Sequence, residues 1–242
     1  MNEELDGQVC GVDGCAVPGE TAAAATLDSS PRDELNIVSD VICPWCYVGK
    51  RRLEKALGML DASARPRITW RPFELNPQMP KEGMDRREYR MRKFGSWERS
   101  QQMDAQLSAV AAQEGLNFRF DLLQRTPNTF DAHRLIWLAG QRGIQDAVVE
   151  TLFRGYFSEG SNVGDHAVLA DLAGEAGMER AEVLAFLAGE WGAAEVKADE
   201  LVATGAGLSG VPSFIFKGRL LFSGAQPSDV IARVLSGMLA AA

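Results

Sequence analysis

Residues 39–57 read SDVICPWCYVGKRRLEKAL and place two cysteines, Cys43 and Cys46, with two residues between them. The apolar, β-branched run LNIVSDVI at 35–42 precedes them and predicts a buried strand. Pro44 suits the first turn of a helix, because the N–H that proline lacks has no partner there in any case. Apolar residues then recur at helical spacing. The cysteine pair therefore stands where a buried strand gives way to an amphipathic helix.

The rest of the chain supplies partners for this strand and helix. RITWRPFEL at 67–75 alternates like a second strand, and strand, helix, strand at this spacing predicts a parallel pair with a right-handed crossover. From about residue 76 to 208 the apolar spacing is helical. β-like sequence returns at 213–216 and 220–224 as a predicted hairpin, and a last amphipathic helix covers about 227–241.

The spacing of the two cysteines allows three interpretations: a redox pair, part of a zinc site, or two inert buried thiols. In thiol–disulfide exchange the thiolate attacks, and the unpaired amides at a helix N-terminus favour that anion. Cys43 is predicted to lie at this terminus, with Cys46 one turn further in and more buried. A C-x-x-C between strand and helix is typical of a thioredoxin-like redox motif. The alternatives are structural zinc held by Cys10, Cys15, Cys43 and Cys46, and two inert buried thiols.

Three further residues are predicted to meet the substrate. Pro212, in SGVPSFIF, precedes the returning strand, where its X-Pro bond is a candidate for the cis form. In a thioredoxin-like sheet this loop lies beside the C-x-x-C, so the exposed backbone of Val211 is expected to pair with an extended substrate strand. Trp45, between the cysteines, is expected to be partly exposed and to offer an apolar contact.

Asp40 lies three residues before Cys43 and admits two roles. Its carboxylate can accept a proton or tune a neighbouring thiol, or it can cap the turn before the helix. The two histidines are too few and too far apart for a metal site. His133 is expected to pack within the helical segment, and His166 to face solvent near a helix N-terminus.

The chain resembles the DsbA-like thioredoxin superfamily, and within it the FrnE-like branch. The segments that carry the resemblance are VSDVICPWCYVGKRRLE, WRPFELNPQMPKEGMDRREY, PNTFDAHRLI, YFSEGSNVGD, GVPSFIF and SGAQP, which occur in family order. The resemblance implies an α/β, thioredoxin-like fold with an inserted all-helical domain, which agrees with the order of elements above. Residues 34–75 and 209–242 would form the discontinuous thioredoxin-like domain, and residues 76–208 the helical insertion.

The same resemblance implies thiol–disulfide oxidoreductase or isomerase activity. By motif, Cys43 matches the nucleophilic cysteine, Cys46 the resolving cysteine and Pro212 the cis-proline. A neighbouring branch comprises kappa-class glutathione transferases and 2-hydroxychromene-2-carboxylate isomerases, which typically carry Ser in place of Cys43 and lack the second cysteine. Both cysteines are present here, which favours disulfide exchange. The alternative is a glutathione-dependent isomerase or transferase acting on a small aromatic or polyketide-like substrate.

Residues 1–33 are predicted to be a flexible tail outside the family pattern, because they hold almost no large apolar residues. They carry Cys10 and Cys15 in a C-x4-C arrangement. As a random coil, the intervening residues 16–33 span about 23 Å. Cys10 and Cys15 are therefore predicted to reach the C-x-x-C and to act as a second redox pair. A pendant, oxidisable tail is the alternative.

Composition narrows the partners and the compartment. A formal net charge of −8 leaves no basic surface for nucleic acid, and no apolar run is long enough to span a membrane. The acidic N-terminus lacks the pattern of a secretory signal, so a cytoplasmic protein is expected. The expected partners are protein or small-molecule disulfides and thiols. No metal or organic cofactor is expected. Glutathione or another low-molecular-weight thiol is the candidate co-substrate. The oligomeric state stays open between monomer and homodimer.

Overall fold

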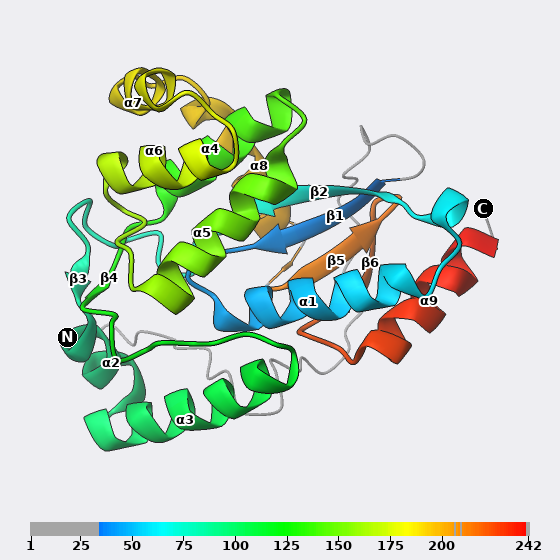
Figure 1. The fold of residues 1–242 in the computed structure, drawn as a ribbon, viewed down its shortest axis with the longest axis horizontal. Coiled ribbons are helices and arrows are strands. Elements are labelled where there is room, and N and C mark those ends of the chain that lie inside the picture. Colours follow the sequence, from blue (N-terminus) through cyan, green and yellow to red (C-terminus); the bar gives the residue numbers. More distant parts are fainter. Residues whose placement is uncertain (1–33, 206, 209, 241–242) are drawn as a thin grey trace.

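The computed structural model describes residues 34–240 apart from residues 206 and 209 (Figure 1). Its strands are β1 (Glu34–Ser39), β2 (Arg67–Pro72), β3 (Met84–Asp85), β4 (Arg125–Thr126), β5 (Ser213–Phe216) and β6 (Arg219–Ser223). Its α-helices are α1 (Pro44–Gly58), α2 (Arg86–Phe94), α3 (Trp97–Gln113), α4 (Phe130–Gln141), α5 (Gln145–Glu159), α6 (His166–Glu175), α7 (Arg180–Ala188), α8 (Ala193–Gly205) and α9 (Ser228–Ala240).

Four strands form one mixed sheet in the order β2-β1-β5-β6 (Figure 1). β1 pairs in parallel with β2 and antiparallel with β5, which in turn pairs antiparallel with β6. All six residues of β1 are buried, as its apolar run predicts for a central strand. The two β-containing ends of the chain therefore meet in one sheet, and the predicted parallel pair and hairpin are confirmed.

The hairpin turns at two residues of positive φ, Lys217 at 48° and Gly218 at 72°. Two successive residues of this kind match the right-handed twist of the strands that they join. The turn therefore brings β6 back along β5. Because β5 also pairs with β1, with Ser213 opposite Val38, the loop preceding Ser213 lies beside the end of β1.

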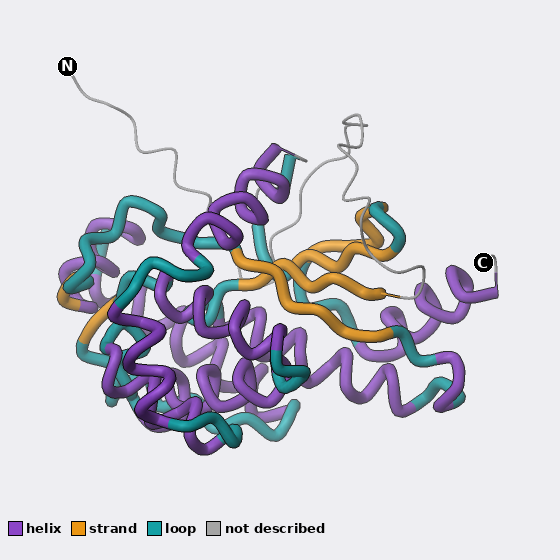
Figure 2. The backbone as a smooth tube through the Cα atoms, turned by 90° about the horizontal axis from the view of Figure 1, so that it is seen from above, coloured by secondary structure: helices purple, strands orange, loops and turns teal. Residues whose placement is uncertain are grey.

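Helices cover both faces of the sheet. α1 and α9 lie side by side against one face, whereas α8 lies against the other (Figures 1 and 2). One continuous hydrophobic cluster includes Ile37 and Phe214 of the sheet, Leu53 of α1, and Phe153 and Phe157 of α5. The sheet and the helical segment between β2 and β5 therefore share buried apolar surface, which fixes one against the other.

The structure differs from the sequence-based prediction at two places. β2 ends at Pro72 and not at Leu75, because the Leu75 amide donates to the Asp40 side chain at 2.7 Å instead of extending a strand. Within the helical segment, β3 and β4 pair antiparallel as a small ribbon. Each has two residues, which is too short for the alternation by which a strand is recognised.

The architecture confirms the predicted fold class, a thioredoxin-like α/β fold with a helical insertion. The domain boundaries near residues 75 and 208 stay predictions, since the hydrophobic core runs across them. No helix in the described ranges has the length and apolar character needed to cross a membrane.

Candidate active site

The cysteine pair lies at the N-terminus of α1, where the chain leaves the carboxyl end of β1. Cys43 is the N-cap residue, with φ −86° and ψ 110°, and Pro44 is the first residue of the helix. The Cys43 amide donates to the Asp40 carbonyl and the Cys46 amide donates to the Cys43 carbonyl, each at 3.0 Å. Both thiols are free, and Cys43 is 5% exposed against 1% for Cys46. The predicted placement of the two sulfurs is confirmed.

The loop before β5 lies directly against the first sulfur. Cys43 Sγ donates to the Val211 carbonyl at 3.6 Å, and the Val211–Pro212 bond is cis, as expected. Val211 itself is buried, so its carbonyl in this structure faces the thiol and not open solvent. The Pro212 carbonyl is held by the Gly224 amide at 2.7 Å. Strand β1, helix α1 and the Val211–Pro212 loop thus converge on one sulfur atom.

The second sulfur is held as a thiol. Complete burial raises the pKa of Cys46 well above its usual value, and the neighbouring Cys43 raises it further. The Ser39 side chain and the Asp40 amide interact with the same sulfur but do not offset the burial. Cys46 therefore keeps its proton at neutral pH, whereas Cys43 lies further out, at the N-terminus of α1.

Asp40 is fully buried, and its side chain is engaged with the backbone. Oδ1 accepts from the Ile42 amide at 3.3 Å, and Oδ2 accepts from the Leu75 amide at 2.7 Å. Of the two roles predicted for Asp40, the capping of the turn is therefore visible in the hydrogen bonds. The carboxylate joins the loop that carries Cys43 to the segment that follows β2.

The basic residues after the cysteines are committed to ion pairs. Lys50 is buried and pairs with Glu54, Asp146 and Glu150, and Arg51 also pairs with Glu150. These contacts tie α1 to α5 and neutralise the lysine charge. The positive field at Cys43 is thus left mainly to the helix terminus itself.

Trp45 is half-buried against the hydrophobic core, which agrees with the partial exposure expected of it. His166 begins α6, is partly exposed, and places Nε2 2.7 Å from Asp131 Oδ2. His133 is buried within α4, as expected, and it also faces a charged group outside its own helix. It is 3% exposed, and its Nε2 lies 3.7 Å from Asp40 Oδ1.

Sequence reasoning missed the groups that share the surroundings of His133. Glu74 follows β2 and Glu200 lies in α8, and each has a side-chain oxygen that is buried without a hydrogen-bond partner. No motif links positions 40, 74, 133 and 200, since they come together only through the topology of the sheet and the helical segment. Asp40, within the apolar run LNIVSDVI, is the one of these four residues whose sequence surroundings indicate a special role.

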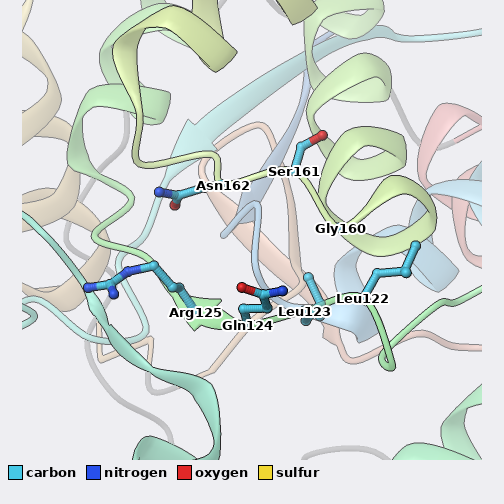
Figure 3. Close-up of a pocket in the computed structure, with 7 residues that line it drawn as sticks. All are labelled: Leu122, Leu123, Gln124, Arg125, Gly160, Ser161 and Asn162. Carbon is cyan, nitrogen blue, oxygen red and sulfur yellow. The ribbon is translucent and has the colours of Figure 1, made fainter.

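No group of three or more His, Cys, Asp or Glu in the described part of the chain is arranged to hold a metal. Cys10 and Cys15, which the zinc alternative and the second redox pair both require, lie outside the described residues. A cavity of about 290 Å³ lies elsewhere, between residues 122–125 and residues 160–162 (Figure 3). None of the predicted site residues lines it.

A C-x-x-C pair at the head of α1, with a cis-proline loop against its first sulfur, is the arrangement of a thioredoxin-like protein. The chain belongs to the DSBA-like thioredoxin domain family, whose model matches residues 34–236. The family supports a thiol–disulfide oxidoreductase or isomerase in general terms.

Individual relatives agree with this assignment. The chain is 38% identical to a probable DsbA oxidoreductase from Streptomyces coelicolor, with a TM-score of 0.77 over 84% of this chain and 88% of the other. It is 27% identical to the uncharacterized protein YwbO of Bacillus subtilis over 84% of this chain and 95% of YwbO. The cytosolic disulfide reductase DsbM of Pseudomonas aeruginosa has the same fold, with a TM-score of 0.61 and 21% identity over 86% of this chain and all of DsbM.

Proposed function

We propose that the protein is a thiol–disulfide oxidoreductase in which Cys43 attacks and Cys46 resolves. The observation that carries the proposal is the asymmetry of the two sulfurs. Cys43 is the N-cap residue of α1 and its sulfur contacts the Val211 carbonyl, whereas Cys46 is enclosed and protonated. One sulfur is thus placed to react with an incoming disulfide, and the other is held in reserve beside it.

The reaction proceeds in two exchanges. The Cys43 thiolate attacks one sulfur of the substrate disulfide, that S–S bond breaks, and the departing thiolate takes a proton from solvent. Cys46 then loses its proton and attacks Cys43 Sγ, which releases the second substrate thiol and leaves Cys43–Cys46 oxidised. Substrate rearrangement followed by release of Cys43 gives isomerisation instead.

Trp45, Val211 and Pro212 are proposed to hold the substrate. The hydrogen bond from Cys43 Sγ to the Val211 carbonyl lasts only while the sulfur carries a proton. Ionisation therefore frees that carbonyl to accept from the backbone amide of an extended substrate. Trp45 adds an apolar surface beside the same sulfur.

Reduction of insulin disulfides by the full chain, with dithiothreitol as the electron source, tests the proposal. Cys43→Ser is expected to abolish turnover above the background rate. Cys46→Ser is expected to accumulate a mixed disulfide between Cys43 and the substrate, visible by mass spectrometry. Turnover that survives Cys43→Ser, or a Cys46→Ser protein that traps no substrate, would refute the assignment.

Glutathione is a second candidate substrate, because DsbM, which shares the fold, has been solved with GSH. A glutathione-dependent isomerase or transferase would keep its turnover in Cys46→Ser, since it needs no resolving cysteine. A disulfide reductase would lose it. A cytosolic location belongs to the same proposal, in keeping with the cytosolic DsbM.

The tail cysteines extend the proposal. Cys10 and Cys15 are proposed to exchange with Cys43–Cys46 as a second redox pair, on the strength of their sequence spacing alone. Replacing both with serine is expected to slow turnover and to change the steady-state oxidation of Cys43. Unchanged values of both would assign them to a pendant tail.

A further inference from the structure

Four ionisable side chains meet in the joint between the sheet and the helical segment. They come from four parts of the chain: Asp40 after β1, Glu74 after β2, His133 from α4 and Glu200 from α8. Glu74 Oε2, His133 Nε2 and Glu200 Oε1 are buried, and none of them has a hydrogen-bond partner. We call these four residues the buried carboxylate cluster.

The cluster has more negative than positive groups. Lys197 of α8 acts on both Glu74 and Glu200, and Tyr156 of α5 lies close enough to interact with Asp40. Fully ionised, three carboxylates would face one imidazolium and one ammonium. Since an unpaired charge is strongly disfavoured in a buried site, one of the carboxylates is expected to hold an additional proton.

The titration behaviour of the cluster agrees with this count. Burial and the charge of Glu200 raise the pKa of Glu74 to about 7. Burial alone lowers the pKa of His133, but Asp40, Glu200 and Glu74 outweigh it and raise the pKa above its usual value. The number of protons bound by the cluster therefore changes close to neutral pH. Apolar side chains of similar size would avoid the free-energy cost of burying these charges.

Asp40 connects the cluster to both cysteines. Its carbonyl accepts from the Cys43 amide at 3.0 Å, and its own amide interacts with Cys46 Sγ. Its carboxylate faces His133 Nε2 at 3.7 Å. One buried residue thus contacts the Cys43 amide and Cys46 Sγ through its backbone and the cluster through its side chain.

Resting on the proposed function, we propose that the buried carboxylate cluster takes up a proton from solvent when the Cys43–Cys46 disulfide is reduced, with His133 as the positioning residue opposite Asp40. A dithiol supplies two electrons and becomes a disulfide, the S–S bond breaks, Cys46 Sγ takes one proton, and Cys43 Sγ is released as a thiolate, which cannot donate to the Val211 carbonyl. The negative charge that appears on Cys43 raises the affinity of the cluster for a further proton.

The chain has two histidines, which makes a direct test simple. The full chain carrying Cys10→Ser and Cys15→Ser is titrated by NMR of the imidazole protons, once oxidised and once reduced by dithiothreitol, with His166→Asn to assign the signals. Reduction is expected to shift the titration of His133 to higher pH and to leave that of His166 unchanged. Identical His133 curves in the two redox states would overturn the proposal.

The reduction potential gives a second readout. Each proton taken up with the electron pair adds about 30 mV per pH unit to the slope of potential against pH. For a two-electron couple, about 30 mV corresponds to a tenfold change in the equilibrium constant. The slope near pH 7 is expected to be steeper in the unsubstituted protein than in Glu74→Gln. Glu88→Gln, on the exposed face of α2, is the matched control and keeps the steeper slope.

The role of the cluster and the proposed function of the cysteine pair are tested by different outcomes. Equal slopes in the unsubstituted protein and in Glu74→Gln would overturn the role of the cluster while leaving the redox pair intact. A Cys43–Cys46 pair that forms no reversible couple with dithiothreitol would refute the proposed function instead.

Discussion

At the scale of single residues, Asp40 organises the loop that carries Cys43. Its two carboxylate oxygens hold the amides of Ile42 and Leu75, and its carbonyl holds the amide of Cys43. Three backbone amides, two in the loop that carries Cys43 and one in the segment after β2, are thus held by one buried residue. A buried carboxylate with two amide donors satisfies the rule that buried polar groups are hydrogen-bonded, whereas Glu74 and Glu200 break it.

Glu74→Gln is expected to change how stability depends on pH. Because the pKa of Glu74 is raised to about 7 in the folded protein, its favourable contribution is present below about pH 4.5 and is lost as pH rises through 7. The amide does not ionise, so the variant should gain about 1–2 kcal/mol on the unsubstituted protein between pH 4.5 and 8, a value reduced by partial solvation. Urea unfolding at several pH values measures this, and a pH-independent difference would contradict it.

The cysteines and the cis-proline were predictable at this scale, because C-x-x-C and Val-Pro are local signals at the ends of predicted elements. His133 was assigned to packing because a single histidine in an apolar helix carries no sign of its neighbours. Its partners lie 93, 59 and 67 residues away along the chain, at Asp40, Glu74 and Glu200. Contacts of that separation follow from the topology, which a single sequence does not resolve.

At the scale of elements, α1 is shaped to fit the loop that carries Val211 and Pro212. A Cβ atom on Gly49 would lie 3.1 Å from Pro212 Cγ and 3.7 Å from Phe214 Cζ. Glycine in mid-helix costs about 1 kcal/mol of helix propensity. Close packing of α1 against the active-site loop is the reason to tolerate it here.

Gly49→Val is expected to push the Val211–Pro212 loop away from Cys43. Overpacking of this kind costs about 1–3 kcal/mol, and the displaced loop should also slow insulin reduction. Gly58→Val is the matched control in the same helix, because a Cβ there meets nothing within 4 Å. Thermal unfolding and turnover of both variants test the idea, which would be wrong if the two variants lost equal stability and activity.

At the scale of the whole molecule, charged side chains reinforce the apolar joint between α1 and the helical segment. Glu150 of α5 accepts from Tyr47 at 2.8 Å and pairs with Lys50 at 3.1 Å and with Arg51. The sequence predicted a βαβ unit, a helical segment and a closing ββα unit, because each has a clear periodicity. It did not predict that Lys50 is buried, since a run of three basic residues usually faces solvent.

Glu150→Gln is expected to weaken this joint in a pH-dependent way. Burial opposes ionisation, but the hydrogen bond from Arg51 and the charge of Lys50 lower the pKa of Glu150 to about 2. Its contribution to stability is therefore complete above about pH 4.5 and is lost as pH falls toward 2. The variant should be about 1–3 kcal/mol less stable at pH 7, because Lys50 loses a buried partner.

The same variant provides its own internal check across pH. The stability difference between Glu150→Gln and the unsubstituted protein should shrink as pH falls from 4.5 to 2, where the native carboxylate becomes protonated. Glu88→Gln removes an exposed pair with Arg92 and should cost less than about 0.5 kcal/mol at any pH. A gap of constant size down to pH 2 would mean that Glu150 acts through shape and hydrogen bonding alone, and that its charge does not hold α1 against α5.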